Sequence, residues 1–553
     1  MHNVDKDGIG NVRRTAARST DLSQLLPNLT LVTDLPESHQ RQLSMRVALV
    51  NMPFGSTRYP SMQLGLLQAI LARRGISAKT QYLNLEFAAR AGWEQYEWLC
   101  DVRCHNLGEW IFAKAAFDDL APDASLFLDM FGDELHGKLK NSNISIDMLL
   151  DLREQKAPAF LRECLEMVPW GDYDVVGFTS TFEQNCAALG LARLIKEKYP
   201  HVITVFGGAN FEDVMGLEYM RALSWIDYAI IGEADKIFPE LLEHIAAGDI
   251  ILDIPGVVHR TGDHIVFSGR GPMMQNLDNL PVPEYDDYFT TAAKLNIPWV
   301  MIVLFESSRG CWWGAKQHCT FCGLNGLGMA FRSKSPERVL VEIHELARRY
   351  NIYNFQAVDN ILDHKHIEQV LGKLIEDRFD YHIFYEVKAN LSPQQLRTLA
   401  RSGVRTIQPG IESLSSHVLE LMRKGTSAIQ NVRLLKWALY YGMSVNWNIL
   451  TGFPDELVID YESQLAIMRL IPHLQPPDSF GRFWLERFSP LHSSSEEFSI
   501  TNVRADRGYT YIYPRHIDFE KIAYFFEYDI VSSYCFYHSV FFFLHFIWVQ
   551  HSF

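Results

Sequence analysis

The chain is poor in cysteine and in positive charge, and each shortage excludes a class of protein. It has eight cysteines in 553 residues, too few for a scaffold held together by disulfides. Lysine and arginine number 51 against 66 acidic residues, for a net charge of −15. Since proteins that bind nucleic acid usually present a basic face, this balance argues against a nucleic-acid partner. Apolar residues make up 48% of the chain, which indicates a globular protein of roughly two to four domains.

The N-terminus also lacks the apolar core of a secretory signal. Residues 1–21 read MHNVDKDGIGNVRRTAARSTD, and no targeting segment is indicated. Residues 1–44 as a whole are polar and rich in turn-forming residues, which predicts a disordered leader. We therefore expect a cytoplasmic protein, in which thiols stay reduced.

The C-terminal segment, residues 496–553, has an unusual end. Residues 531–553 contain no Asp, Glu, Lys or Arg, and their length is close to the roughly 20 apolar residues of a transmembrane helix. His538, His545 and several serines interrupt this run. We favour a truncated or frameshifted end standing in place of a lost domain. A membrane anchor and an aromatic packing segment stay open as alternatives, and Cys535 in this segment is given no function.

Residues 45–250 alternate between short apolar runs and segments of helical periodicity, which predicts a doubly wound α/β domain with a parallel sheet. The strands are expected at 46–53, 80–85, 174–181, 202–210 and the start of 226–245. Residues 90–170 interrupt the alternation and are predicted to be a helical insertion. Within it, residues 108–117 are expected to form an amphipathic packing helix.

Small and polar residues end three of these predicted strands. Ligands of doubly wound sheets bind at the carboxyl ends of the strands, so these residues are candidates for contact with a flat ligand that lies close to the backbone. Ordinary glycine turns are the alternative. The candidates are Thr179, Ser180, Gly207, Gly208, Gly232 and Glu233.

A connector, residues 251–298, separates this domain from a second one. It contains a predicted hairpin and a linker rich in Pro and Asp at 276–288, where we place the domain boundary. Residues 299–495 then alternate again through about six β-α units, and the predicted strands end in polar residues or glycine. This pattern is typical of a partial or complete TIM-type barrel, which carries its chemistry at the carboxyl ends of the strands.

The second domain opens with a cysteine-rich stretch, Glu306 to Lys334. Cys311, Cys319 and Cys322 are spaced C-x7-C-x2-C. Three thiolates can hold three irons of a four-iron cluster and leave the fourth iron open to a substrate. The spacing therefore makes an iron–sulfur cluster the leading hypothesis for the metal site.

Other uses of these cysteines stay open on spacing alone. A zinc site needs four ligands, and His318 could supply the fourth. A redox dithiol would need only the last two cysteines. Gly310 and Gly314 would let the loop turn tightly in either case.

The residues around the cysteines resemble the cluster loop of radical S-adenosylmethionine (SAM) enzymes. Those enzymes usually have the spacing C-x3-C-x2-C with an aromatic residue directly before the last cysteine, and Phe321 is that aromatic here. The first gap departs, with seven residues instead of three. The longer gap, with SSRGCWWG at 307–314 and HCTFCGLNG at 318–326, resembles the radical SAM enzymes that mature ribosomally made peptides, often described as peptide C-methyltransferases.

The resemblance implies the chemistry of the site. The three cysteines would bind a [4Fe–4S] cluster whose open iron chelates SAM. An electron from a donor such as flavodoxin or ferredoxin would cleave SAM to methionine and a 5′-deoxyadenosyl radical, which abstracts hydrogen from an unactivated carbon. The substrate would be a precursor peptide, and the barrel would be a partial (β/α)6 barrel.

The resemblance also assigns residues at the strand ends. Asp359 and Asn360 would take the place of the contact with the SAM amine, although the family's glycine-rich run is missing here. Glu412 resembles a SAM contact on the fourth strand, with a salt bridge at the barrel mouth as the alternative. Gly452 and the following Pro454 match a turn near the adenine. Trp312 and Trp313 would shield the cluster, stack on a ligand or pack in the core.

The first domain resembles the cobalamin-binding domain that precedes many radical SAM domains. The matching stretches are Val47 to Pro53, GFTST at 177–181, FGGAN at 206–210 and IIGEAD at 230–235. The motif D-x-H-x-x-G, whose histidine ligates cobalt in other cobalamin enzymes, is absent from residues 46–250. The resemblance implies C-methylation with cobalamin. Radical modification without cobalamin, such as thioether formation or epimerisation, and a non-catalytic metal-bearing protein that binds peptides remain alternatives.

Overall fold

The computed structural model describes residues 45–102, 104–140, 142–248 and 253–530. The predicted leader at 1–44 and the predicted abnormal end at 531–553, with Cys535, lie outside these residues. No helix in the described part of the chain is both long and apolar enough to cross a lipid bilayer.

The first sheet has seven strands in the order β2-β1-β3-β4-β5-β6-β7. Strands β1 to β5 are mutually parallel, and their order is that of a doubly wound, flavodoxin-like sheet. The predicted α/β fold with a parallel sheet is confirmed. The strands are β1 (Arg46–Asn51), β2 (Ser77–Tyr82), β3 (Val175–Thr179), β4 (Ile203–Gly207), β5 (Tyr228–Ile230), β6 (Val257–Thr261) and β7 (His264–Phe267).

The hairpin of β6 and β7 belongs to this sheet and not to a connector. Strand β6 pairs antiparallel with β5, with His259 opposite Tyr228, and β7 pairs with β6. Placing residues 251–298 in a connector was therefore wrong for the hairpin. The residue pattern predicted the hairpin, but it could not predict which sheet edge the hairpin joins.

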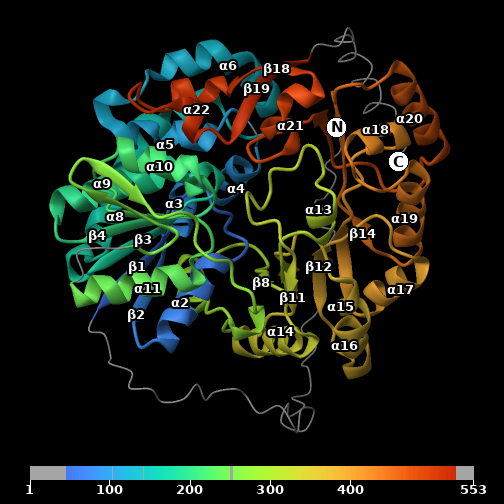
Figure 1. Ribbon diagram of the computed structural model, residues 1–553, viewed down its shortest axis with the longest axis horizontal. Coiled ribbons are helices and arrows are strands. Elements are labelled where there is room, and N and C mark those ends of the chain that lie inside the picture. Colours follow the sequence, from blue (N-terminus) through green and yellow to red (C-terminus); the bar gives the residue numbers. More distant parts are fainter. Residues whose placement is uncertain (1–44, 103, 141, 249–252, 531–553) are drawn as a thin grey trace. The chain divides into compact units, whose positions relative to one another are not determined.

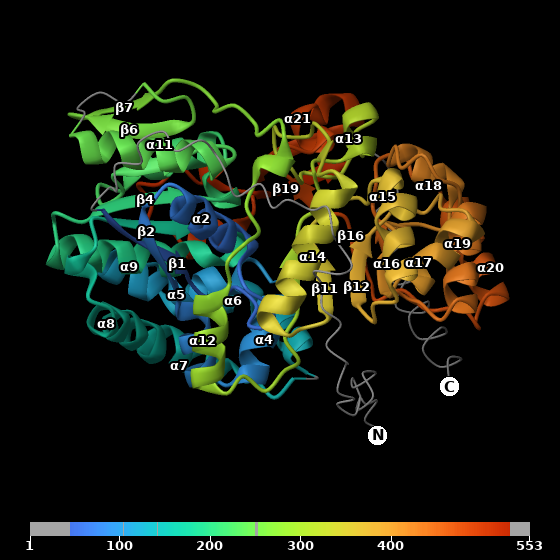
Figure 2. The same cartoon turned by 90° about the horizontal axis from the view of Figure 1, so that it is seen from below.

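Helices cover both faces of the first sheet because successive strand residues point to opposite faces. Val47 and Leu49 pack with α2 (Met62–Arg73) and α11 (Ala234–Ala247). Ala48 and Val50 pack on the other face, toward α5 (Leu107–Phe117) and α9 (Asn185–Lys198). Figure 2 shows α11 on one side of β1 to β4 and α9 on the other.

The insertion between β2 and β3 is helical, as predicted, but its helix α5 is not amphipathic. Every residue of α5 except Lys114 is buried, so the expectation of an amphipathic helix at 108–117 was wrong. Glu109 is buried because its carboxylate accepts the backbone N–H groups of Asn185 and Cys186, at 2.7 and 2.5 Å. The other helices here are α3 (Leu83–Ala91), α4 (Trp93–Asp101), α6 (Ala124–Leu139), α7 (Ile146–Asp151) and α8 (Ala157–Met167).

The second half of the chain forms an open barrel of parallel strands. Five strands lie in the order β14-β13-β12-β11-β8, and a parallel bridge between Glu412 and Ile449 connects them to the pair β15-β16. The strands are β8 (Val303–Phe305), β11 (Asn354–Ala357), β12 (His382–Glu386), β13 (Val404–Gln408), β14 (Ser444–Val445), β15 (Asn448–Thr451) and β16 (Ser479–Arg482).

Helices lie outside these strands, which confirms the partial TIM-type barrel (Figure 1). Ser335 caps α14 as expected, because its hydroxyl accepts the N–H of Arg338. The helices are α14 (Pro336–Tyr350), α15 (His364–Gln369), α16 (Leu371–Asp377), α17 (Pro393–Arg401), α18 (Ser416–Leu421), α19 (Ala428–Tyr440) and α20 (Val458–Leu470).

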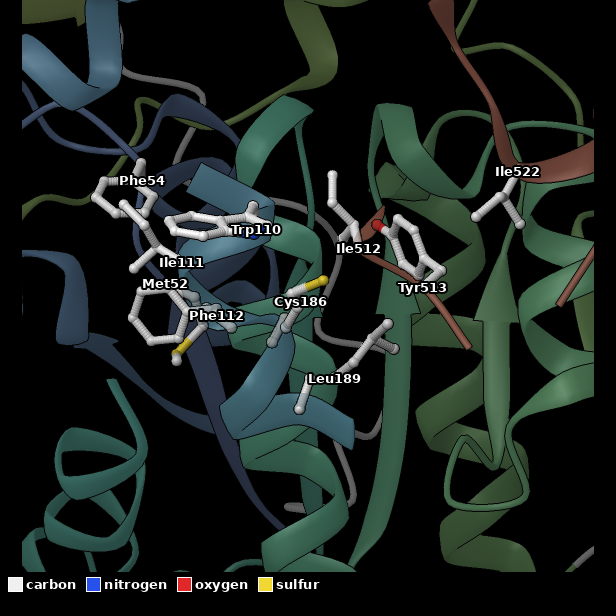
Figure 3. Packing of buried hydrophobic residues seen from close by; sticks show 14 of the residues in the cluster. Met52, Phe54, Trp110, Ile111, Phe112, Cys186, Leu189, Ile512, Tyr513 and Ile522 are labelled. Atoms are coloured by element: carbon white, nitrogen blue, oxygen red, sulfur yellow. The ribbon is translucent and has the colours of Figure 1, made fainter. Parts of the chain in front are cut away.

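The chain after the barrel returns to the first domain. A three-stranded antiparallel sheet, β17-β19-β18, is formed by β17 (Leu485–Glu486), β18 (Ile500–Ala505) and β19 (Phe525–Ile530). Residues between its strands enter the core beside α5 and α9. Figure 3 shows Ile512 and Tyr513 in one cluster with Trp110 and Cys186. This segment is thus an integral part of the first domain's core.

Short elements complete the described chain. They are α10 (Val214–Ala222), α12 (Asp286–Leu295), β9 (Ser308–Arg309), α13 (Trp312–Lys316), β10 (Arg332–Ser333), α21 (Pro490–Ser493) and α22 (Phe519–Ile522), with eight further single-turn segments among the described residues.

Candidate functional site

The cysteine-bearing loop is closed at its neck by two short strands. Strand β9 pairs antiparallel with β10, so that Arg309 lies opposite Arg332. Gly310 follows with φ of 75°, and a Cβ there would lie 2.3 Å from the carbonyl oxygen of Ala330. Only glycine fits this turn without strain, which confirms that the loop turns tightly at this position.

Hydrogen bonds hold the loop against three other parts of the molecule. Thr320 N–H donates to the Met422 carbonyl at 3.0 Å, and Gly323 N–H donates to the Glu486 carboxylate at 2.9 Å. The indole of Trp312 donates to the Leu362 carbonyl at 3.2 Å, and that of Trp313 donates to the Arg423 carbonyl at 3.0 Å. Both tryptophans therefore fasten the short helix α13 to loops at the barrel mouth.

Cys311 begins α13, where its sulfur accepts the Gly314 N–H at 3.3 Å. Burial raises the pKa of Cys322 to about 12, and burial also raises the pKa of Cys319. The ammonium groups of Lys424 and Lys388 oppose the rise in the pKa of Cys319. Two cations beside buried thiols stabilise the thiolate form, which is the form that binds iron.

These two lysines are themselves held in place. The Nζ atom of Lys388 lies 3.6 Å from the centroid of the Trp313 ring, and it donates to the backbone carbonyl of Lys424. Lys424 is 3.5 Å from the carboxylate of Glu412. The loop thus sits against a fixed cationic wall, which suits the negative charge of a cluster held by three thiolates.

The zinc alternative fits this loop less well. His318 is the candidate fourth ligand, and its Nε2 atom lies 2.8 Å from the carbonyl oxygen of Cys322, a hydrogen-bond distance. Within the described residues, no group of three or more His, Cys, Asp or Glu side chains is arranged to hold one metal ion. A four-iron cluster takes each cysteine on a different iron, so its ligands do not converge on one point.

Asp359 and Asn360 lie at the end of β11 but make different contacts. Asp359 is buried, and its carboxylate accepts hydrogen bonds from the N–H of Ser307 at 2.7 Å and the hydroxyl of Ser308 at 3.0 Å. Burial raises the pKa of Asp359 to about 6. Asn360 donates to the side chain of Asn325, in the cysteine loop, at 2.7 Å. Asp359 thus ties the start of the loop to the barrel.

Glu412 and Gly452 both have left-handed backbones at the ends of their strands. Glu412 has φ of 57° and Gly452 has φ of 81°. Residues other than glycine rarely adopt this backbone region, and those that do are found more often at functional sites. Glu386, at the end of β12, interacts with both Glu412 and Lys424, and burial raises its pKa to about 7. Charged groups thus gather at the carboxyl ends of the barrel strands.

A cavity of about 1880 Å³ lies between the two sheets. Sites for one small ligand usually occupy about 300–1,000 Å³, so this cavity has room for more than one. The carboxyl ends of β1, β3, β4 and β5 line it from one side, and barrel residues and the C-terminal sheet line it from the other. Six of the predicted residues take part: Thr179, Gly207, Gly208, Gly232, Glu233 and Phe321.

The glycines at this edge leave the backbone open to the cavity. Gly208 has φ of 99°, and a Cβ there would lie 2.5 Å from the carbonyl oxygen of Ser180. Gly232 has φ of 97°. Ser180 itself is buried and lies outside the lining, because its hydroxyl bonds with Asn185 and Asn210, both at 2.9 Å. Its assignment to a ligand contact is therefore not supported by its position.

Glu233 lines the cavity but is engaged by two arginines of the cysteine loop. Arg332 approaches its carboxylate at 2.7 and 3.0 Å, and Arg309 approaches it at 3.5 Å. Arg309 also pairs with Asp235 and Glu306, each at 2.6 Å. We call these five residues the neck ion network. It joins the loop to the end of β5, so Glu233 contacts protein where a ligand contact was predicted.

A histidine, His105, lines the cavity, and both of its ring nitrogens are engaged by carboxylates. Nδ1 lies 2.9 Å from Asp506 and Nε2 lies 3.2 Å from Glu134. Although burial lowers the pKa of His105, the two carboxylates outweigh it and raise the pKa to about 9. A protonated, paired imidazole is not a ligand for cobalt. His105 would therefore not serve as a metal ligand in this paired state.

Sequence reasoning missed Lys424, Arg309 and Arg332 as parts of the site. Arg309 stands within the quoted SSRGCWWG, and a buried role could have been suspected from its place between Glu306 and Gly310. Lys424 follows α18 in an ordinary polar stretch, and no local signal marks it.

A family model for the radical SAM superfamily matches residues 305–463. An uncharacterized methyltransferase of Pyrococcus horikoshii is 26% identical over 302 residues, 54% of this chain and 64% of that protein. The hopanoid C-3 methylase of Methylococcus capsulatus is 26% identical, over 56% of this chain and 58% of its own. The cobalamin-dependent radical SAM methyltransferase TokK of Streptomyces tokunonensis is 28% identical over 164 residues, 29% of this chain and 23% of its own. The chain thus spans less than two thirds of the length of these curated relatives.

Two solved structures share the fold of most of this chain at low sequence identity. The cobalamin-dependent radical SAM enzyme OxsB, solved with aqua-cobalamin, has a TM-score of 0.59 at 13% identity and covers 89% of this chain and 65% of its own. The radical SAM methyltransferase TsrM of Kitasatospora setae, solved with cobalamin and a [4Fe–4S] cluster, has a TM-score of 0.57 at 15% identity and covers 90% and 89%. The chain therefore contains a radical SAM domain, and its homologues include cobalamin-dependent radical SAM methyltransferases.

Proposed function

We propose that this protein is a radical SAM C-methyltransferase that uses cobalamin. The observation that carries the proposal is the position of the three-cysteine loop, at the mouth of a radical SAM barrel that opens onto a cavity shared with the carboxyl ends of a doubly wound sheet. The barrel mouth and the carboxyl edge of the first sheet face the same cavity. This arrangement suits a reaction that uses two cofactors.

The loop residues have the chemistry that a [4Fe–4S] cluster needs. Cys311, Cys319 and Cys322 would hold the three irons, and Lys388 and Lys424 would balance the negative charge of the cluster. When bound, the cluster supplies the electron that cleaves SAM. Glu412 and Gly452, with their left-handed backbones at the barrel mouth, are proposed to contact SAM.

The glycine edge of the first sheet is the proposed seat of cobalamin, which supplies the methyl group when bound. Gly207, Gly208 and Gly232 line the cavity without side chains, and a broad planar ring can approach the backbone there. His105 stays paired with two carboxylates, so it would bound the pocket and not bind the metal.

The substrate we propose is a ribosomally made precursor peptide, with the modification at an unactivated carbon. The proposal rests on the likeness of SSRGCWWG and HCTFCGLNG to the loops of peptide-maturing radical SAM enzymes. An electron donor of the flavodoxin or ferredoxin type would reduce the cluster in the cytoplasm. None of these partners is required by the fold itself, since one fold serves many reactions.

The test is cobalamin binding by the anaerobically reconstituted protein, measured by equilibrium dialysis for the wild type and for Gly207→Val. A Cβ at Gly207 would meet only Ile230, at 3.8 Å, so the fold accepts a side chain there while the cavity edge fills. We expect at least about a 10-fold loss of affinity. Gly137→Val, on the exposed side of α6 with open space around it, is the control. Equal cobalamin affinity in all three proteins would contradict the proposal that cobalamin binds at the glycine edge.

A further inference from the structure

Arg482 is a cation of the cavity wall with an unusual environment. It ends β16, the last strand of the barrel, and lies beside Thr451 of β15. Its side chain crosses Gly452, where a Cβ would lie 2.9 Å from the Cγ atom of Arg482. Its guanidinium lies 4.4 Å from the centroid of the Tyr528 ring. The absent side chain at Gly452 and the ring of Tyr528 thus set the position of this charge.

Arg482 differs from the other cations of the cavity in having no carboxylate partner. Arg309 pairs with Asp235, Arg504 and Arg507 pair with Glu527, and Lys138 pairs with Glu134. Within the described residues, Arg482 has no acidic group within ion-pair distance, and its side chain is exposed. An arginine held by an aromatic ring and without an acid can bind an anion through its planar fork of N–H donors.

Aromatic side chains stand next to this charge. Arg482 and Trp484 flank the buried Phe483, and both line the cavity. Trp484 is 41% exposed, and its ring meets that of Phe525 edge to face at 4.8 Å. Across the cavity edge, Phe182 is 39% exposed and stacks on Phe525 at 6.3 Å. We call Phe182, Trp484 and Phe525 the aromatic wall.

The backbone of Phe182 adds a separate indication that the aromatic wall is functional. Phe182 has φ of 47°, three residues after the end of β3, and a bulky residue in this region is a backbone outlier. Such strain persists where the surroundings hold a side chain in a particular place, and it clusters at ligand sites. The strain here presents a half-exposed ring to the cavity.

We infer that Arg482 and the aromatic wall bind the substrate of the enzyme, and that the bound group is an anion, carboxylate or phosphate, attached to a planar or aromatic moiety. The inference rests on the proposed function, because it places the acceptor between the glycine edge and the barrel mouth. In a peptide substrate this group would be an acidic side chain or a terminal carboxylate beside an aromatic residue.

The experiment measures binding of small probes to the anaerobically reconstituted full chain by isothermal titration. N-acetylphenylalanine carries ring and carboxylate, its amide lacks the charge, N-acetylalanine lacks the ring, and phenyl phosphate replaces the carboxylate. We expect the wild type to prefer N-acetylphenylalanine over its amide by about 10-fold. Arg482→Gln should abolish this preference, and Arg482→Lys should restore part of it. Comparing the two anions distinguishes a carboxylate site from a phosphate site.

Two controls make the result specific. Arg504→Gln removes a cation of the same cavity that is already paired with Glu527 at 2.9 Å, and it should keep the preference. Trp484→Leu should lower the affinity for N-acetylphenylalanine toward that of N-acetylalanine. No binding of any probe to the wild type, or an unchanged preference in Arg482→Gln, overturns the inference.

Two further measurements separate this inference from other failures. If Arg482→Gln weakens SAM binding as much as probe binding, Arg482 belongs to the SAM site and the inference is wrong. The same preparations are assayed for 5′-deoxyadenosine. A wild type that cleaves SAM without charge preference contradicts the substrate site alone. A wild type that shows the preference but never cleaves SAM contradicts the proposed function and leaves an anion-binding site.

Discussion

At the scale of single residues, the proposed chemistry depends on charged side chains that the fold holds beside the cysteines. The Lys424 side chain is 15% exposed and lies next to Cys319, Cys322 and Glu412. Its charge is thus one of the few that could balance a cluster at this position. Replacing it changes the electrostatic field at the loop without removing an iron ligand.

We therefore expect Lys424→Gln to make the reduction potential of the reconstituted cluster more negative, on the order of 50 mV for the loss of one nearby positive charge. The measurement is a redox titration followed by electron paramagnetic resonance at matched iron content. Lys365→Gln, an exposed lysine on α15, is the control and should leave the potential unchanged. An unchanged potential in Lys424→Gln would show that this lysine does not face the cluster.

A second residue-scale prediction concerns Glu109. Burial raises its pKa to about 7, against the stabilising N–H groups of Cys186 and Asn185. Because the folded state binds this proton more tightly than the unfolded state, the stability from Glu109 is complete below about pH 4.5 and is lost as pH rises through about 7. The loss between pH 5 and 8 should be about 2–3 kcal/mol.

Denaturation midpoints at pH 5 and pH 8 check this for the wild type and Glu109→Gln. The variant lacks the titrating group. Its free energy of unfolding should therefore increase relative to that of the wild type as pH rises. Asp119→Asn, at an exposed carboxylate of the same insertion, should follow the wild type. Parallel pH profiles for Glu109→Gln and the wild type would contradict the prediction.

The residues that the sequence could and could not assign differ in a physical way. Cys311 and Gly208 carry local signals, since spacing and glycine express the geometry that they need. Lys424 comes near the cysteines only through the folding of the barrel. Ser180 shows the reverse error, because a polar residue at a strand end can equally bond inward, as this one does with Asn185.

At the scale of elements, the neck ion network couples the cysteine loop to the first sheet. Arg332 and Glu233 have side chains that are 9% and 20% exposed, so removing one partner leaves the other charge poorly solvated. We expect Arg332→Gln and Glu233→Gln each to lower the free energy of unfolding by about 2–4 kcal/mol.

The double variant tests whether the two residues act as a pair. Arg332→Gln with Glu233→Gln should lose clearly less stability than the sum of the single losses, because the stranded charge is gone. Denaturant titration of all four proteins gives the coupling. Strictly additive losses would mean that the two side chains stabilise the molecule independently, contrary to their 2.7 Å contact.

The C-terminal segment gives a second prediction for elements. Ile512 is fully buried in the cluster with α5 and α9, although the sequence placed it in a segment without an assigned fold. Ile512→Ala should lower the free energy of unfolding by about 2–5 kcal/mol, as large-to-small changes in cores do. Thr510→Ala, two residues away and exposed, should cost much less. Similar small losses for both would place this segment outside the core.

The elements themselves followed well from the sequence. Apolar periodicity marked the strands of both sheets, since alternating burial and helix caps such as Ser335 are local properties. Which elements pack or pair with one another was harder to predict from the sequence. The β6–β7 hairpin joins the first sheet and α5 is buried on all sides, because each outcome depends on neighbours distant in sequence.

At the scale of the whole molecule, the proposed function depends on the cavity between the two sheets. Sequence reasoning predicted a doubly wound sheet and a barrel, and each brings its strand ends to one edge. It did not predict that the end of β16, the residues just after it and strand β19 line the cavity with Arg482, Trp484 and Phe525, respectively. That wall arises because the chain crosses from the barrel back to the first domain after β16.

The central claim is that the cysteine loop supports reductive cleavage of SAM. The most direct measurement is 5′-deoxyadenosine formation by the protein reconstituted anaerobically with iron and sulfide and supplied with dithionite and SAM. We expect 5′-deoxyadenosine from the wild type and none from a variant with Cys311, Cys319 and Cys322 all replaced by Ala. No product from a wild type that carries a well-formed four-iron cluster, or a purified protein that binds one zinc and no iron, would contradict the account.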